Sequence, residues 1–401
     1  MKLVQTFQFQ IKPNGKQRKL MLQFAGNARK IWNLILAKQQ NYIKGEKFTS
    51  SFGMNYWLIE LKKEMPYLAK SPAQTLQQVT KNLELAFKSF FAKRAGFPKF
   101  KKKGRASNGF RYPQGFKLEQ NNSRIYLPKL GWISYYKSRN ILGKIKNVTV
   151  KQYCNKWFIS IQTQHDMPQP KTMATTEIGI DVGIARFATL SNGDYIEPLN
   201  SFKRKSLRLA RYQRCMSRKK KFSKNWKRAK TRVQKIHYKI ANARKDFLHK
   251  TTTTISKNHA IVCIEDLQIK NMSKSAKGNF ASPGRNIQQK SGLNRSILDQ
   301  AWGEFRRQLE YKLAWRGGLL VAVNPKNTSR RCPSCHHTCA NNRTTQEKFI
   351  CVECGYANNA DVVGAINILE QGHCLLACGE LGQLDHSVKQ EPAEMTQALV
   401  A

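Results

Sequence analysis

The chain has 401 residues, enough for two or three domains, and 40% of them are hydrophobic, which excludes wholesale disorder. Lysine and arginine number 71 against 24 acids, and a net charge of +47 destabilises a compact protein unless a polyanion neutralises it, so we expect a nucleic-acid partner. No apolar run reaches the roughly 20 residues of a membrane span, and the N-terminus lacks a secretory apolar stretch. We therefore expect a cytoplasmic, nucleoid-associated protein with reduced thiols and no membrane partner.

Residues 1–170 are predicted to form a β-rich domain with a helical domain inserted. Residues 1–12 include an alternating apolar and polar run typical of a strand, and residues 13–93 repeat apolar side chains at helical spacing. Short β-like runs then fall within residues 94–170. We expect them to build a small barrel or sandwich with the first strand. These runs are 124–127, 131–136, 145–152 and 157–162.

Residues 171–370 are predicted to form an α/β domain. Its strands are expected within 176–199, 260–264 and 319–323, of which the last two are apolar enough to be buried. Together with the first domain, this predicts an α+β multidomain protein.

Two further segments of the second half carry weaker signals. Residues 268–294 are polar and contain glycine and proline, so we predict a mobile loop. A helix should follow, with one apolar stripe from Ile297 through Ala301 to Leu313. Residues 371–401 lose the basic bias and predict a flexible tail.

The most basic segment is 203–250, predicted to be a pair of helices. No acid occurs between Lys203 and Arg244, so the paired charges of an ordinary solvated helix are missing. We favour helices lying on nucleic-acid backbone over a solvated hairpin. The side chains expected to contact nucleic acid are Lys203, Arg204, Lys205, Arg208, Arg211, Arg218, Lys219, Lys220, Lys221, Lys227, Arg228 and Arg330.

Four cysteines have the spacing of a zinc site. Cys332 and Cys335 are separated by two residues, as are Cys351 and Cys354, and fifteen residues separate the pairs. Two such pairs close a tetrahedral shell of thiolates and leave no open position. We therefore predict one structural zinc ion within residues 328–358.

Three acids lie at the ends of apolar segments. Asp181 and Glu265 each follow a strand-like run, and Asp361 opens a helix-like run, where an acid alone also fits a plain helix cap. Carboxylates in apolar surroundings are costly unless they are paired or bind a metal. Together the three predict a site for two Mg²⁺ ions that hydrolyses a phosphodiester.

In order along the chain, the Asp181 strand, the Glu265 strand, the two cysteine pairs and the segment Asn359–Asp361 resemble the split RuvC motifs and inserted zinc ribbon of the TnpB (OrfB) family. The resemblance covers most of the chain and is sharpest over residues 176–370. It implies a β-rich wedge domain with an inserted helical recognition domain, then an RNase H-like (RuvC) domain, in a prokaryotic mobile-element protein. It also implies that Asp181, Glu265 and Asp361 are catalytic.

The function implied by the resemblance is RNA-guided, Mg²⁺-dependent cleavage of double-stranded DNA beside a short flanking motif. The guide RNA would be encoded near the protein's own gene. Two alternatives stay open: an RNA-guided repressor or accessory transposition factor that does not cleave, and a transposase that joins DNA ends. The residues do not decide between a monomer and a dimer.

Overall fold

The computed structural model describes residues 2–40, 48–104, 107–166, 170, 172–280 and 282–378. The chain divides into two compact units, Met1–Pro168 and Gln169–Ala401. The greater part of the predicted tail, from residue 379 onward, lies outside the described residues.

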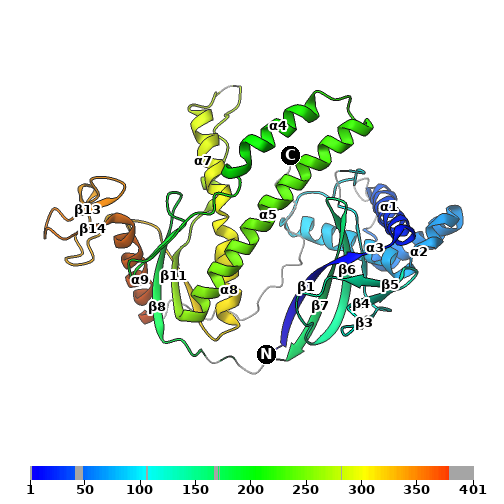
Figure 1. Ribbon diagram of the computed structural model, residues 1–401, viewed down its shortest axis with the longest axis horizontal. Helices are drawn as coiled ribbons and strands as arrows, with labels where there is room; N and C mark the ends of the chain where they lie inside the picture. Colours follow the sequence, from blue (N-terminus) through cyan, green and yellow to red (C-terminus); the bar gives the residue numbers. More distant parts are fainter. Residues whose placement is uncertain are drawn as a thin grey trace. The chain divides into compact units, whose positions relative to one another are not determined.

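The first unit is built on one seven-stranded antiparallel sheet (Figure 1). Its strand order is β2-β6-β7-β1-β5-β4-β3. The N-terminal strand belongs to this sheet, as expected, and is its central strand. Phe7, Phe9 and Ile11 of β1 are buried and alternate with polar side chains along the strand. The strands are β1 (Lys2–Lys12), β2 (Gly109–Tyr112), β3 (Lys117–Glu119), β4 (Arg124–Leu127), β5 (Gly131–Tyr135), β6 (Lys144–Tyr153) and β7 (Lys156–Asp166).

The helices of the first unit lie between β1 and β2 in the chain. The first begins at a capping box in which Asn14 and Gln17 each bond the other's backbone N–H. Its early residues, such as Phe24, pack into the core of the sheet, whereas its later residues, such as Ile35, pack against the other helices. One helix therefore joins the core of the sheet to the core of the helices. The helices are α1 (Gly15–Gln39), α2 (Ser51–Glu64), the 3-10 turn η2 (Pro66–Lys70) and α3 (Ala73–Phe91).

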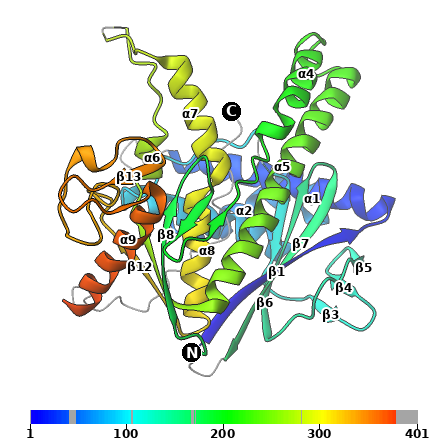
Figure 2. The same ribbon diagram turned by 60° about the vertical axis from the view of Figure 1, so that its left-hand side comes forward.

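The second unit has a five-stranded mixed sheet of order β10-β9-β8-β11-β12. β8 is antiparallel to β9 and parallel to β11, which is in turn parallel to β12. One face is covered by α5 and α8 and the other by α9 (Figures 1 and 2). This is the predicted RNase H-like arrangement. The strands are β8 (Thr176–Val182), β9 (Ala188–Leu190), β10 (Tyr195–Ile196), β11 (His259–Glu265) and β12 (Leu319–Val323).

The predicted zinc ribbon enters between β12 and α9 as the small hairpin β13 (Lys348–Ile350) and β14 (Ala357–Asn359). The remaining elements of the second unit are helical. They are η3 (Lys203–Lys205), α4 (Ser206–Ser217), α5 (Lys224–Asn258), α6 (Ile269–Met272), α7 (Ile287–Gln300), α8 (Trp302–Ala314), the 3-10 turn η4 (Ala340–Asn342) and α9 (Ala360–Ala377). Among the described residues, no helix is both long enough and apolar enough to cross a bilayer.

Three sequence predictions need correction here. Two short stretches of the predicted loop 268–294 are helical, because α6 and the first turns of α7 lie in it. The single helix expected around Ala301 is two helices, α7 and α8, since Ala301 has a φ of 58° in the left-handed region and interrupts the helix. Finally, α9 continues through Ala377, past the predicted start of the tail, because Leu375 and Leu376 pack against the sheet.

Candidate active site and cysteine cluster

The RNase H-like sheet brings Asp181 and Glu265 to neighbouring strand ends. Ile180 of β8 pairs with Ile264 of β11, and the two strands are parallel. Asp181 and Glu265 each follow by one residue, so they lie beside each other at the carboxyl ends of the strands. This topology joins two acids that are 84 residues apart in the sequence.

Asp361 reaches the same place from α9, which packs directly on β8. A Cβ atom added at Gly179 of β8 would lie 2.0 Å from the carbonyl oxygen of Ala365 on α9. A Cβ atom added at Gly364 would lie 3.1 Å from Oδ2 of Asp181. Glycine at both positions is thus what allows the helix to approach the strand so closely.

The helix cap at α9 is Asn359, not Asp361. The Asn359 side chain accepts a hydrogen bond of 3.0 Å from the Asp361 N–H, so the plain capping role considered for Asp361 belongs to its neighbour. The Asp361 carboxylate instead lies 3.3 Å from the Arg343 guanidinium, in the segment that carries the cysteines. The Asp361 carboxylate is therefore not used to cap the helix and is available to the group of three carboxylates.

The three carboxylates interact electrostatically. Burial, followed by the negative charges of Glu265 and Asp361, raises the pKa of Asp181 to about 8, and Arg343 opposes this rise. Burial also raises the pKa of Glu265, while a hydrogen bond from Thr328 lowers it. A cation placed among these groups would relieve both the burial cost and the repulsion.

The carboxylates are less tightly gathered than the cysteines. The four cysteine sulfurs all lie within 4.8 Å of one another. No other set of three or more His, Cys, Asp or Glu side chains in the described part of the chain, the carboxylates included, is that close. A wider carboxylate spacing suits two ions about 3.5–4 Å apart better than one ion held by all three groups.

Thr328 is a further candidate functional residue, to which the sequence motifs assign no role. Its buried hydroxyl donates a hydrogen bond of 2.7 Å to Oε1 of Glu265. Asn367 of α9, fully buried, donates to the backbone carbonyls of Thr328 and Arg331 at 2.7 and 2.8 Å. The start of the cysteine-bearing segment is thereby held against the candidate active site, through long-range contacts that sequence periodicity does not reveal.

The four cysteines come together as two matching turns. Sγ of Cys332 lies 3.6 Å from Sγ of Cys354, and Sγ of Cys335 lies 3.5 Å from Sγ of Cys351. In each turn, the N–H four residues after the first cysteine donates to that cysteine's carbonyl at 3.0 Å. Those donors belong to His336 and Gly355, whose φ values are 61° and 72°. The cluster can therefore hold one metal ion.

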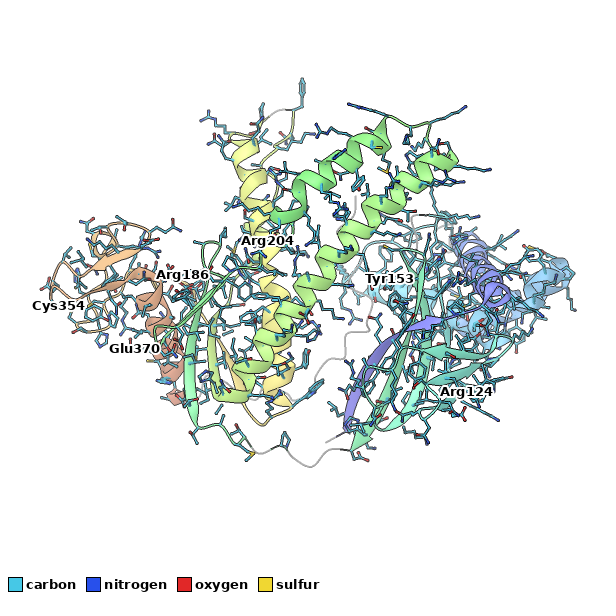
Figure 3. The ribbon with its side chains drawn as sticks, viewed as in Figure 1. Arg124, Tyr153, Arg186, Arg204, Cys354 and Glu370 are labelled. Atoms are coloured by element: carbon cyan, nitrogen blue, oxygen red, sulfur yellow. The ribbon has the colours of Figure 1, made fainter. Side chains whose placement is uncertain are left out.

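The cysteine-bearing segment is tied to α9 by charge. Arg331, next to Cys332, lies 3.3 Å from Glu370, whose carboxylate is also 3.6 Å from Nδ1 of His336. Figure 3 labels Glu370 on α9 and Cys354 in the ribbon. The same helix thus carries Asp361 at its start and contacts the first cysteine turn further along.

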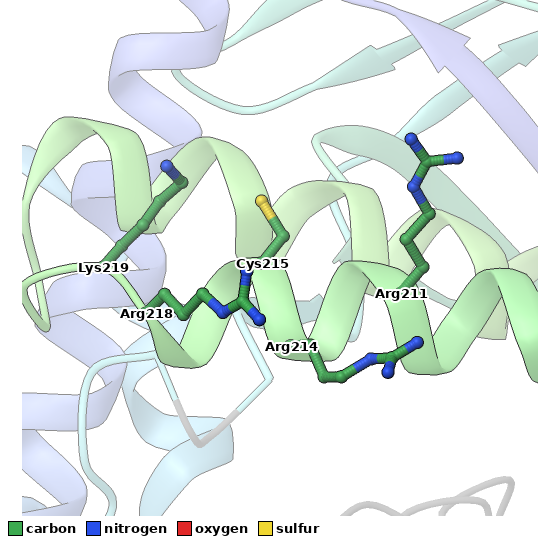
Figure 4. A pocket seen from close by; sticks show the side chains of 5 residues that line it. All are labelled: Arg211, Arg214, Cys215, Arg218 and Lys219. Carbon is green, nitrogen blue, oxygen red and sulfur yellow. The ribbon is translucent and has the colours of Figure 1, made fainter.

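The basic hairpin is formed by α4 and α5, as predicted. A small apolar core joins the two helices and includes Leu209, Val233 and Ile236. The cations chosen from the sequence as nucleic-acid contacts are exposed or half-buried throughout. Figure 4 shows three of them, Arg211, Arg218 and Lys219, beside two further side chains at the end of α4, where they line a hollow of about 430 Å³ on the hairpin and not at the carboxylates. The lining side chains are Arg211, Arg214, Cys215, Arg218 and Lys219.

The base of the hairpin is anchored by Asp299, a second residue that the sequence did not single out. Its buried carboxylate accepts hydrogen bonds from the Ser201 hydroxyl at 3.1 Å and the Phe202 N–H at 2.9 Å. It also pairs with Arg244 of α5 at 2.6 Å. One acid from α7 therefore holds both arms of the hairpin where they leave the domain.

Comparison with known proteins decides the family. The chain is 54% identical to "Putative RNA-guided DNA endonuclease InsQ" of Escherichia coli (strain K12), over 99% of this chain and all of the relative. The chain belongs to the TnpB/OrfB family. A second relative, "Putative RNA-guided DNA endonuclease" of Streptomyces pristinaespiralis, is 30% identical over 98% of this chain and 97% of its own length.

Family models match three parts of this TnpB/OrfB chain. The OrfB model described as "Probable transposase" covers residues 159–276, and a "Cas12f1-like, TNB domain" covers 302–368. A model described as "Helix-turn-helix domain" covers residues 1–47, although the described part of that range contains a strand and a single α-helix. The second match includes the four cysteines and Asp361.

A solved structure shares the fold. It is the cryo-EM structure of a Cas12f1–sgRNA–target DNA complex, whose protein is 14% identical to this TnpB/OrfB chain. The match has a TM-score of 0.54 and covers 92% of this chain and 98% of the other. At that identity the likeness supports the architecture alone.

Proposed function

We propose that this TnpB/OrfB protein is an RNA-guided DNA endonuclease of a mobile element. It would cleave double-stranded DNA beside a short flanking motif, directed by an RNA encoded near its own gene. The observation that carries the proposal is the electrostatic coupling of Asp181 with Glu265 and Asp361, three acids from distant segments of a very basic chain. The similarity to relatives named as RNA-guided DNA endonucleases supports the guided part.

In the proposed active site, Asp181, Glu265 and Asp361 would hold two Mg²⁺ ions. Oxygen ligands suit this hard cation, and the burial and repulsion that raise the pKa of Asp181 favour a bound cation. When bound, such ions would supply an activated water and charge stabilisation for the leaving oxygen in phosphodiester hydrolysis. The protein side chains then need only bind, orient and balance charge.

Two neighbours support this role. Thr328 orients the Glu265 carboxylate through its 2.7 Å hydrogen bond, as outer partners of metal ligands commonly do. Arg343 lies beside Asp361 and lowers the pKa of Asp181, so it supplies part of the positive charge that the carboxylates require.

The cysteine cluster is proposed to bind one structural Zn²⁺ ion. Four sulfurs at Zn–S distances of about 2.3 Å in a tetrahedron would lie about 3.8 Å apart, close to the 3.5 and 3.6 Å separations of the two closest pairs. Four thiolates leave no open position for substrate. Zinc would therefore stabilise the segment that supplies Thr328 and Arg343.

The basic hairpin is proposed to hold nucleic-acid backbone. Its cations would neutralise phosphates and make binding depend on salt, whereas base pairing with the RNA would read the target sequence. We propose this role for the cations predicted from the sequence between Lys203 and Arg228, and also for Arg330 at the start of the ribbon.

The proposal is tested with protein produced from its gene together with the flanking DNA. RNA that copurifies is sequenced, and linear DNA carrying the matching target beside randomised flanks is incubated with Mg²⁺ or with EDTA. We expect cleavage that needs the matching target, one flanking motif and Mg²⁺. Protein without RNA, or cutting that ignores the target sequence, would overturn the proposal.

The same experiment separates the two alternatives. A repressor or accessory factor would bind the matching target and leave it uncut. A transposase would join the DNA ends, so its products would include new junctions, whereas hydrolysis yields only free ends.

A further inference from the structure

An exposed aromatic pair stands at the tip of the basic hairpin. Phe222 lies in the turn between α4 and α5 and keeps 66% of its surface exposed. Trp226, in the first turn of α5, contacts it edge to face with the ring centroids 5.5 Å apart. The two adjoining rings offer apolar surface that a partner could remove from water.

The conformation of Phe222 adds to the case. Its φ is 69°, in the left-handed region that bulky side chains rarely adopt. Ser223 follows and caps α5 by accepting the Trp226 N–H at 3.1 Å, and its own N–H donates to the Lys220 carbonyl at 3.1 Å. The turn is therefore well hydrogen-bonded around a strained aromatic residue, a combination common at binding sites.

The surroundings of the pair are cationic. Nζ of Lys221 lies 5.6 Å from the centre of the Phe222 ring, and Nζ of Lys230 lies 5.2 Å from that of Trp226. Lys219, Lys220 and Lys224 flank the turn in a segment without acids. A partner for this surface must combine a flat apolar face with negative charge. An unpaired nucleotide has both, whereas an apolar protein surface lacks the charge.

We infer that the Phe222–Trp226 tip is a stacking site for an unpaired base of a single-stranded nucleic acid, with the neighbouring lysines on its phosphates. The inference rests on the proposed function in one respect, that the chain binds nucleic acid. It adds a site that reads no sequence, since every base has a face that can stack. The strand is either the RNA or the DNA strand displaced from the target.

The test uses the full chain carrying its copurified RNA and a 12-nucleotide single-stranded DNA with 2-aminopurine at successive positions. A parallel arm reconstitutes the protein with RNA that carries the same base analogue. Stacking quenches 2-aminopurine, so at one position in one arm we expect quenching that Phe222→Ala and Phe222→Leu abolish and Phe222→Tyr preserves. The arm that responds identifies the strand.

Affinity provides a second readout. Phe222→Ala should weaken binding of the responding strand by about 5- to 150-fold, the usual range for one stacked base, with an unchanged dependence on salt. Lys220→Ala should instead keep the quenching and reduce the salt slope by about one phosphate contact. Leu207→Ala, which removes another exposed apolar side chain from α4, should change neither.

Quenching that survives Phe222→Ala in both arms would overturn the inference. So would an equal loss of affinity in Leu207→Ala, which would indicate a general apolar contact. Guided DNA cleavage by the wild-type protein is scored separately. The stacking site can therefore fail while the nuclease stands, and a wild-type protein that binds no nucleic acid would refute the proposed function first.

Discussion

The cysteine cluster and the three carboxylates are two candidate metal sites of opposite construction. The first and last cysteines, Cys332 and Cys354, are 22 residues apart in the sequence, and the four sulfurs lie within 4.8 Å of one another. Asp181 and Asp361 are 180 residues apart, and the three carboxylates are joined only through the sheet and α9. One site is assembled by two local turns, and the other needs the whole domain.

The difference bears on what each site can do. A closed set of four thiols has nothing left to offer a substrate, so its metal can only stabilise structure. Burial and the charges of Glu265 and Asp361 disfavour the ionised form of Asp181, and a bound cation would relieve both. Thr328 and Asn367 connect the two sites, so the cysteine-bearing segment helps to position the Glu265 carboxylate.

The largest effect is expected from breaking the cluster. Cys332→Ser should release the zinc ion and unfold the ribbon, because structural zinc contributes roughly 10–16 kcal/mol in small zinc peptides. Metal analysis by mass spectrometry and limited proteolysis of residues 328–358 measure this. Cys339→Ser, a cysteine of the same segment outside the cluster, is the matched control. Zinc content equal to wild type would mean that the ligands are misassigned.

The next effect comes from removing a carboxylate. Asp181→Ala should reduce guided cleavage by about a thousand-fold or more, since metal-assisted charge stabilisation is worth several kcal/mol. Binding to target DNA, measured by gel shift, should persist. Asp194→Ala, an exposed acid in the turn between β9 and β10, should leave cleavage intact. Undiminished cleavage by Asp181→Ala would remove this residue from the site.

A smaller loss is expected where the two sites meet. Thr328→Val keeps the shape of the side chain and removes the hydrogen bond to Glu265, so cleavage or metal affinity should fall about 10- to 100-fold. The signature of a positioning role is that Thr328→Val needs a higher Mg²⁺ concentration to reach half of its maximal rate. Thr328→Ser keeps the hydroxyl, so it should need the same Mg²⁺ concentration as wild type. A change in rate that no Mg²⁺ concentration affects would point to a different cause.

The smallest expected effect concerns the pH dependence of stability. Folding raises the pKa of Asp181 to about 8, so the folded protein holds a proton that the unfolded chain loses near pH 4. The stability of the metal-free protein should therefore fall as the pH rises from about 4 to 8. In buffer without Mg²⁺ at pH 8.5, Asp181→Asn should melt a few degrees above wild type, and the gap should close at pH 4. Parallel melting curves across this range would contradict the shift.

The same contrast explains what could be predicted from the sequence. The cysteine site and strands such as 124–127 and 319–323 follow from local spacing and periodicity, and the structure matches them. A shared site for the three acids was predicted from their places at the ends of apolar segments and from the family resemblance, whereas no local pattern states which strands are neighbours. The break at Ala301 stayed hidden, since an alanine gives no warning of a left-handed backbone.

The remaining features that the sequence did not predict depend on contacts between residues far apart in the chain. Asn359 is the helix cap in place of Asp361, because its side chain, two residues earlier, accepts the Asp361 N–H. The hydrogen bonds from Thr328 to Glu265 and from Asn367 to the ribbon cross 63 and 39 residues of sequence. Such contacts depend on the packing of α9, which becomes visible only in three dimensions.

The central claim is that Asp181, Glu265 and Asp361 share a pair of metal ions. Anomalous X-ray scattering from Mn²⁺ tests it most directly, in crystals of the protein with its RNA and a DNA target that resists cleavage. We predict two Mn²⁺ peaks about 3.5–4 Å apart, with all three carboxylates as ligands. Mn²⁺ bound elsewhere, or a carboxylate among the three that reaches neither ion, would contradict the account.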